Sequence, residues 1–368
     1  MTNTDQRTSA EGLGIAIAAR TPVLLWGPPG SGKTSVVRVM AAASDLPVEV
    51  VVAAIREPSD FAGLPIVVDG EVRFAPPAWA KRLRDANTGI LFFDEISTAP
   101  PAVQAALLRV VLDRWVGDLE LPSGVVIVAA ANPPDQAAGG WDLAAPLANR
   151  FCHLDWPADA GVFAEGIAGH WPEPPVALLP EDWETSLPAA QGLVSTFVAA
   201  RPSLLCAVPG DAATAGGGWP SPRSWEMVTR LWAAAAAVDA SPEARNALVV
   251  GCLGMGAGTE FLAWVGRMDL PDPETVLAAP ERFHLPKRGD RALAVLASVS
   301  AAVVARNTPE RWAKAWQVIA RAAEDRPDVA AVAARVLAAN RPPGAQAPAE
   351  IRALAPVLKA AGLLRESA

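Results

Sequence analysis

One segment, residues 27–34, constrains the fold of this chain more than any other. It reads Gly-Pro-Pro-Gly-Ser-Gly-Lys-Thr and satisfies the pattern G-x-x-x-x-G-K-[ST] at every fixed position. The apolar run of residues 23–26 precedes it and a stretch with helical spacing, residues 34–43, follows it. This is the strand–loop–helix context that the pattern requires. The sequence therefore predicts a loop whose backbone N–H groups, together with the N-terminus of the helix, surround phosphate oxygens.

The residue types in this loop predict how a nucleoside triphosphate is held. The ammonium group of Lys33 would reach the β- and γ-phosphates, and the hydroxyl group of Thr34 would be a ligand of Mg²⁺. The alternative is a glycine-rich turn with an accidental lysine, which does not account for the match in both pattern and context. The candidate nucleotide-binding residues are Gly27, Pro28, Pro29, Gly30, Ser31, Gly32, Lys33, Thr34 and Ser35.

An acidic pair follows a second apolar run. Residues 90–93 read Ile-Leu-Phe-Phe and end in Asp94 and Glu95. The first carboxylate, at a strand end, would hold Mg²⁺ with Thr34, and the second would orient and activate the attacking water. A solvated acidic pair at a strand end is the alternative, and its position after the phosphate loop favours the catalytic interpretation.

Three more polar residues are candidates whose roles the residue types alone leave open. Asn132 ends the apolar run of residues 125–131 and could contact the γ-phosphate or the water, or simply begin a turn before Pro133. Arg150 and Arg223 lie beside predicted helices or turns. Arginine suits the charge of a phosphoryl transition state, but a surface ion pair is the more frequent role of any single arginine.

The pattern of apolar runs predicts the fold class. Four runs, residues 23–26, 48–54, 90–93 and 125–131, are separated by helix-length segments, as in strands buried on both faces of a parallel sheet. Residues 66–74, with Asp69-Gly70 in the middle, predict a β-hairpin. We expect a P-loop αβα sandwich with a parallel sheet over residues 1–160, an all-α lid over residues 161–270 and a C-terminal helical extension over residues 271–368.

Inside the lid, residues 187–200, 223–238 and 242–267 have helical spacing, and residues 209–222 form a Gly/Pro-rich loop. From residue 271 onward the chain predicts alanine-rich amphipathic helices that break at residues 340–348. No apolar run after Pro157 has the character of a strand.

Charge and cysteine content narrow the functional class. The chain has 31 Lys and Arg, 39 Asp and Glu and a net charge of -8, which disfavours a nucleic-acid binder. Three cysteines cannot form a disulfide framework. The N-terminus does not resemble a signal peptide, and the apolar stretches 247–268 and 292–305 do not have the clean length of a membrane span. We therefore expect a soluble, cytoplasmic protein that binds no membrane.

Taken in this order, the motifs resemble an AAA+ ATPase, specifically the MoxR family, within the clade that carries a hairpin inserted in the second helix. The resemblance extends over roughly residues 12–270, and one departure is Asn149, where the family usually has Asp. The phosphate loop and the acidic pair are shared by all AAA+ proteins, whereas the hairpin and the Gln-x-x-Leu-Leu helix are more specific. The matching stretches are residues 24–34, 59–64, 66–74, 91–96, 103–108, 128–134, 148–151 and 220–223.

The resemblance implies roles for the residues that chemistry left open. Asn132 would be the first sensor of nucleotide state. Arg150 would be an arginine finger that reaches a neighbouring subunit's nucleotide, and Arg223 would be the second sensor on the lid. Residues 114–120 would form a hairpin that precedes the first sensor and faces the pore of a ring, where Trp115 is a candidate contact for a client protein.

The resemblance also implies a function. The expected activity is Mg²⁺-dependent ATP hydrolysis in a homo-oligomeric ring, a hexamer, that remodels or activates a partner protein, with a von Willebrand factor A-domain protein as the first candidate. One alternative is a metal-chelatase-type motor subunit, which shares the hairpin and the type of partner. Another is a nucleic-acid motor or clamp loader, which would need a basic pore or an added DNA-binding module. A third is an ATP-bound scaffold without hydrolysis, against which the intact candidate catalytic residues argue.

Overall fold

The computed structural model describes residues 5–133, 136, 141–268, 270–346 and 348–354. The chain divides into two compact units. Unit 1 consists of residues 1–180 and 205–259, and unit 2 consists of residues 181–204 and 260–368. The helices that we assigned to the lid are therefore divided between the two units. That residues 161–270 function as a lid stays a prediction.

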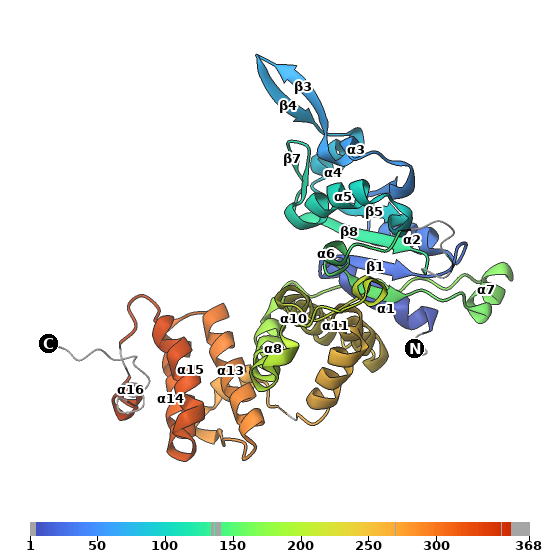
Figure 1. The fold of residues 1–368 in the computed structure, drawn as a ribbon. Helices are drawn as coiled ribbons and strands as arrows, with labels where there is room; N and C mark the ends of the chain where they lie inside the picture. The colour runs from blue at the N-terminus through green and yellow to red at the C-terminus, as the bar shows by residue number, and fades with distance from the viewer. Residues whose placement is uncertain (1–4, 134–135, 137–140, 269, 347, 355–368) are drawn as a thin grey trace. The chain divides into compact units, whose positions relative to one another are not determined.

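Unit 1 is built on a parallel sheet of five strands in the order β2-β5-β8-β1-β9. Figure 1 labels β5, β8 and β1 of this sheet. The four predicted apolar runs are strands, and the predicted fold class is confirmed. The fifth strand was not predicted, because Cys-His-Leu-Asp is short and has no continuous apolar run. The strands are β1 (Val23–Trp26), β2 (Val48–Val52), β5 (Thr88–Asp94), β8 (Gly124–Ala131) and β9 (Cys152–Asp155).

Burial on both faces explains why helices cover the sheet. Residues Ile90, Leu91, Phe92 and Phe93 of β5 are completely inaccessible to solvent, so each face must be covered by another layer. Helix α2 (Lys33–Ala43) follows the phosphate loop. Helix α5 (Pro101–Asp113) has a proline in its first turn and buries an apolar stripe of Val103, Leu107 and Val110.

The predicted hairpin is confirmed, with its turn at the predicted residues. Strands β3 (Leu64–Val68) and β4 (Glu71–Ala75) pair antiparallel. Asp69 and Gly70 have φ values of 53° and 82°, the left-handed backbone that a two-residue turn of a hairpin needs. The hairpin lies between α3 (Ser59–Ala62) and α4 (Ala78–Ala86) and projects away from the sheet of unit 1 (Figure 1).

A second, shorter hairpin lies where residues 114–120 predicted one. Strands β6 (Trp115–Val116) and β7 (Leu119–Glu120) pair antiparallel, and Trp115 is half-buried. The Arg114 guanidinium donates to the Val125 carbonyl at 2.7 Å, which ties the base of this hairpin to β8.

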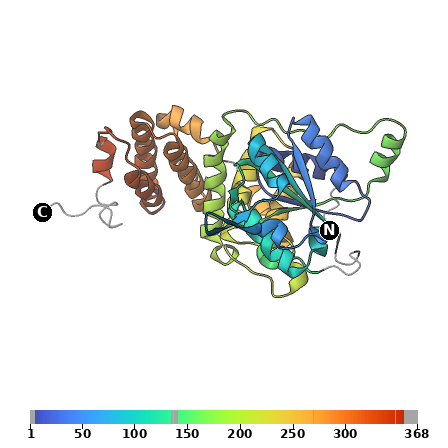
Figure 2. The same cartoon turned by 90° about the horizontal axis from the view of Figure 1, so that it is seen from above.

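Unit 1 also contains α1, α7 and two short helices. Helix α1 (Gln6–Ala18) is capped by Asp5, whose carboxylate accepts a hydrogen bond from the Thr8 N–H at 2.7 Å. Helix α7 (Ala160–Ile167) lies at the end of an excursion of the chain away from the sheet, which Figures 1 and 2 both show. Two short helices are α6 (Ala145–Ala148) and α9 (Ala212–Ala215), and α9 lies in the segment that the sequence predicted as a Gly/Pro-rich loop.

Helices predicted for the lid begin and end close to the expected residues. They are α8 (Leu187–Ala200), α10 (Pro222–Ala237) and α11 (Pro242–Val265). Within the described part of the chain, α11 is the one helix long and apolar enough to cross a membrane, and half of its apolar stretch is buried in the protein. Gly254, with φ 74° and ψ 168°, interrupts its helical backbone.

Unit 2 consists of packed helices, as the alanine-rich pattern predicted. Besides α8 it contains α12 (Pro273–Ala278), α13 (Gly289–Ala305), α14 (Pro309–Asp325), α15 (Pro327–Ala339) and α16 (Ala349–Ala353). Trp312 and Trp316 pack edge to face in its core, with ring centroids 5.8 Å apart.

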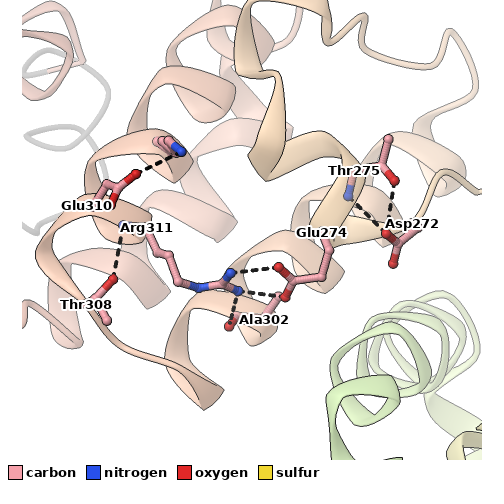
Figure 3. Close-up of polar contacts among 8 residues, drawn as sticks. Asp272, Glu274, Thr275, Ala302, Thr308, Glu310 and Arg311 are labelled. Carbon is pink, nitrogen blue, oxygen red and sulfur yellow. Dashed lines mark hydrogen bonds and ion pairs between the residues drawn. The ribbon is translucent and has the colours of Figure 1, made fainter. Parts of the chain in front are cut away.

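One ion pair joins two helices of unit 2. The Arg311 guanidinium donates two hydrogen bonds of 2.7 Å to the Glu274 carboxylate and a third, of 3.0 Å, to the Ala302 carbonyl (Figure 3). These bonds hold the pKa of Glu274 below its usual range. The planar guanidinium thus connects α12, α13 and α14.

Candidate nucleotide-binding site

A cavity of about 320 Å³ lies at the carboxyl ends of β1, β5 and β8. This is the edge where ligands bind in open parallel sheets. The residues that line the cavity come from the phosphate loop, the acidic pair and the end of β8: Pro29, Gly30, Ser31, Gly32, Lys33, Thr34, Ser35, Asp94, Glu95, Ala130, Ala131 and Asn132. The structure therefore brings most of the predicted site residues together in one place.

The phosphate loop has the backbone that its glycines permit. Gly30 and Gly32 have φ values of 76° and 87°, and an added Cβ at either would meet no other atom within 4 Å. Glycine is needed there for its backbone conformation, and the open space beside it is where a ligand can approach the backbone. Gly32 is the residue directly before α2, so the positive end of the helix points at the cavity.

Lys33 lies at the centre of the site and donates hydrogen bonds to three oxygen atoms. Its Nζ donates to the carbonyl groups of Gly27 at 2.7 Å and Pro28 at 3.0 Å and to Asn132 Oδ1 at 3.1 Å. Burial lowers the pKa of Lys33, and the charges of Asp94 and Glu95 oppose that shift. The ammonium group is thus surrounded by oxygen ligands that phosphate oxygens can replace.

The side chains of Thr34 and Asp94 are hydrogen-bonded to each other at the cavity. The Thr34 hydroxyl donates to Asp94 Oδ2 at 2.7 Å, and the other carboxylate oxygen accepts the Glu95 N–H at 3.1 Å. A hydroxyl and a carboxylate in contact are hard oxygen donors, the ligand type that Mg²⁺ prefers when it also binds phosphates and water. These two residues fit the predicted metal site.

Glu95 has an unusual backbone. Its φ is 56° and its ψ is 41°, a left-handed conformation that is uncommon for a residue with a side chain and that clusters at functional sites. Its carbonyl accepts the Thr98 hydroxyl at 2.9 Å, which fixes the turn. The carboxylate lines the cavity and is exposed to solvent, so a water molecule can reach it.

The two candidate arginines lie apart from these lining residues. Neither Arg150 nor Arg223 is among the described residues that line the cavity. Burial, followed by the charge of Arg223, lowers the pKa of Arg150, and the charge of Asp113 opposes that shift. The Arg150 side chain donates to the Pro146 carbonyl, and its Nε is buried without a partner among the described residues.

The hydrogen bonds of the His153 ring were not predicted from the sequence. The structure shows its Nδ1 accepting a hydrogen bond from the Trp26 indole at 2.8 Å and its Nε2 bonded to the Ala148 carbonyl at 2.9 Å. Because indole is only a donor and a carbonyl only an acceptor, the proton must lie on Nε2. Burial lowers the pKa of His153 to about 4.

Comparison with known proteins bears on the part of the chain that holds the site. Residues 22–151 match the model of the AAA domain, dynein-related subfamily. These residues form an AAA domain. Its bounds include the cavity, the hairpin between α3 and α4, and Arg150, whereas Arg223 and unit 2 lie outside it.

Two curated relatives each match about a third of the chain. An AAA domain-containing protein of Schizosaccharomyces pombe is 35% identical over 127 residues, and the ATPase family gene 2 protein of Saccharomyces cerevisiae is 35% identical over 129 residues. Each aligned segment covers 33% of this chain but only 15% of the relative. The chain therefore spans a small part of the length of these relatives.

One solved structure with a similar arrangement is that of a candidate ATPase from Cytophaga hutchinsonii. It has a TM-score of 0.45 and 18% identity, with 72% of this chain and 90% of that chain covered.

Proposed function

We propose that this chain is a Mg²⁺-dependent ATP hydrolase of the AAA+ class that works as a homo-oligomeric ring, a hexamer, and remodels or activates a partner protein. The observation that carries the proposal is the convergence of Lys33, Thr34, Asp94, Glu95 and Asn132 on one cavity of the AAA domain. A cation, a hydroxyl, two carboxylates and an amide at this place are the groups that hydrolysis of a phosphoanhydride needs.

The geometry of the cavity allows each of these residues a role in ATP hydrolysis. The loop N–H groups bind the phosphates, and Lys33 exchanges its loop carbonyls for β- and γ-phosphate oxygens. Thr34 and Asp94 would hold Mg²⁺, which would neutralise charge on the phosphates. Glu95 accepts the proton of the attacking water while the bond between the γ-phosphorus and ADP breaks. Asn132, already bonded to Lys33, orients the γ-phosphate or the water.

The positions of Arg150 and Arg223 support assembly into a ring. Phosphoryl transfer in this class needs an arginine at the γ-phosphate. Neither Arg150 nor Arg223 lines the described cavity of its own chain. A neighbouring subunit's nucleotide is therefore the target that we assign to Arg150.

The MoxR type is supported by the order of the motifs and by the hairpin between α3 and α4. A protein as partner is supported by the surface of that hairpin. Paired residues share a face, and Pro65, Val67, Val72 and Phe74 make one of its two faces entirely apolar. Val67 and Val72 are 75% and 62% exposed. An isolated two-stranded hairpin with such a face favours a bound protein, and our candidate is a von Willebrand factor A-domain protein.

The activity is tested by measuring phosphate release by the purified full chain from ATP, with Mg²⁺, with a chelator and with added DNA. We expect hydrolysis that needs Mg²⁺, no stimulation by DNA, and assembly into a ring when ATP is present, seen by sedimentation. Tight binding of ATP without turnover would instead favour the scaffold alternative, and strong stimulation by DNA would favour a nucleic-acid motor.

The partner is tested with a purified von Willebrand factor A-domain protein encoded in the same genome. We expect binding that Val67→Asp abolishes while basal hydrolysis remains. Val332→Asp, which places the same charge at an exposed valine of unit 2, is the matched control and should bind normally. Equal binding by the two variants would exclude the hairpin as the docking surface.

A further inference from the structure

Asn149, the residue directly before Arg150, is buried and bonded on both sides of its amide. Its Nδ2 donates to the Trp219 carbonyl at 2.8 Å, and its Oδ1 accepts the Ser221 hydroxyl at 2.6 Å. Its exposed fraction is 3%. Because the Trp219 carbonyl can only accept, the orientation of the amide is fixed. A buried amide with both ends used is held in one rotamer.

The partners of Asn149 are the residues that begin α10. Ser221 is the N-cap of this helix, and its hydroxyl accepts the Ser224 N–H at 3.2 Å. The Ser224 hydroxyl in turn accepts the Ser221 N–H at 2.8 Å and donates to the Trp219 carbonyl at 2.9 Å. This reciprocal cap fixes the first turn of α10, in which Arg223 follows Pro222. The amide of Asn149 thus joins the segment of Arg150 to the turn of Arg223.

We propose that Asn149 is a positioning residue that holds Arg150 and Arg223 as one unit, so that the two guanidinium groups reach a single nucleotide together. The inference rests on the proposed function, because it assumes that these arginines act on ATP. Both side chains belong to unit 1, and neither lines the described cavity of its own chain. Two guanidinium groups on segments that one hydrogen-bond network joins can bind a single anion, and the γ-phosphate region of a neighbouring subunit supplies one.

The chemistry of the site also explains why the residue is Asn where the resembled family usually has Asp. A carboxylate could still accept the Ser221 hydroxyl, but its second oxygen would face the Trp219 carbonyl without a hydrogen to donate. That contact is repulsive and leaves a buried charge without a partner. Asn149→Asp therefore removes one side of the connection at nearly constant size.

The test is steady-state ATP hydrolysis by the full chain, with kcat and KM measured separately. A misplaced catalytic group costs up to about 10²-fold in rate. We expect Asn149→Asp and Asn149→Ala to lower kcat by about that factor while KM for ATP changes little, since no residue of the cavity is altered. Ser221→Ala should have a smaller effect in the same direction, and Ser221→Thr, which keeps the hydroxyl and the cap, should retain kcat within about twofold.

A matched control separates positioning from loss of stability. Ser9 is fully buried in unit 1, and its hydroxyl donates to the Asp155 carbonyl at 2.5 Å. Ser9→Ala also removes one buried hydrogen bond, but no candidate catalytic residue depends on it, so kcat of the folded protein should remain near that of the unmodified chain. If Asn149→Ala does not fold, Ser221→Ala, at the edge of the network, answers the same question.

The decisive measurement is a double-mutant cycle with Arg223→Ala. If Asn149 acts through Arg223, Asn149→Ala lowers kcat much less in the Arg223→Ala background than in the unmodified chain. Equal fold-losses in the two backgrounds, an unchanged kcat in Asn149→Ala, or an Arg223→Ala variant as fast as the unmodified chain would each overturn the inference. Failure of the proposed function is distinguishable, because it would appear as absence of Mg²⁺-dependent hydrolysis in the unmodified chain.

Discussion

Lys33 and Asn132 are bonded through Nζ and Oδ1 at 3.1 Å, although 99 residues separate them in the chain. The bond joins the phosphate loop after β1 to the end of β8, and β1 and β8 are neighbours in the sheet. When a phosphate oxygen replaces Asn132 Oδ1 as the acceptor of the Lys33 hydrogen bond, the Asn132 amide is released. The residue expected to sense nucleotide is thus connected to the cation expected to bind it.

The first prediction separates binding from hydrolysis. Lys33→Ala removes a cation with charge-assisted hydrogen bonds, each worth about 1.5–3 kcal/mol, so ATP affinity should fall by about 10- to 100-fold. Glu95→Gln keeps the shape of the side chain but cannot accept a proton, so it should bind ATP normally and hydrolyse it about 10²- to 10⁴-fold more slowly. Equilibrium binding of a fluorescent ATP analogue and phosphate release distinguish the two. Equal affinity in Lys33→Ala and the unmodified chain would exclude the phosphate-binding role.

The second prediction tests whether Arg150 acts between subunits. Arginine fingers are worth about 10³- to 10⁵-fold in rate, so Arg150→Ala should be nearly inactive yet bind ATP. Mixed with Glu95→Gln and allowed to exchange subunits, it should recover activity above either variant. At some interfaces an intact cavity then faces a neighbour that supplies Arg150.

The control for this experiment is an independent measurement of exchange, by energy transfer between labelled subunits. A finger that acts within its own subunit predicts two inactive variants and no recovery. An arginine that only forms surface contacts predicts that Arg150→Ala alone hydrolyses ATP normally.

The third prediction concerns pH and His153. Its folded-state pKa is about 4, whereas the ordinary value is 6.5. Between these pH values the unfolded chain binds a proton that the folded chain does not, so stability is complete above about pH 6.5 and falls as the pH drops toward 4. From pH 7 to pH 5 the loss should be about 2 kcal/mol. His153→Gln, whose amide can accept from Trp26 and donate to Ala148 without titrating, should lack this part of the loss. Denaturant unfolding of both proteins at pH 7 and pH 5 measures this loss of stability. An equal loss in His153→Gln and in the unmodified chain would refute the prediction.

The fourth prediction concerns the ion pair of unit 2. The Arg311 side chain is 17% exposed and that of Glu274 is 43% exposed, so the cost of breaking the pair should lie between those of surface and buried pairs. Arg311→Met should lower the free energy of unfolding by about 1–3 kcal/mol. Glu310→Gln breaks the exposed pair with Lys314 (Figure 3) and should cost under about 0.5 kcal/mol. ATP affinity should not change in either variant, because none of the described residues of unit 2 lines the cavity. Equal costs for the two substitutions would contradict this ranking.

Much of the site could be predicted because its signals are local in the sequence. The glycines, Lys33 and Thr34 occupy consecutive positions, so their chemistry depends on one loop, and Asp94 and Glu95 follow directly from an apolar strand. The hairpin turn was predictable at Asp69 and Gly70 because only a few residue types tolerate its backbone. The functional roles of Asn132, Arg150 and Arg223 were not predictable from the residues alone and came from the resemblance.

The sequence by itself determined the elements: four of the five strands of the parallel sheet, the long helices and the phosphate loop, because apolar periodicity and backbone preference act over a few residues. Only the tertiary structure decided which elements meet. The bond between Trp26 and His153 spans 127 residues and that between Asn149 and Ser221 spans 72. Whether such groups are partners depends on how the sheet and the helices pack. A short strand such as β9 is likewise stabilised by its neighbour β1 rather than by its own sequence.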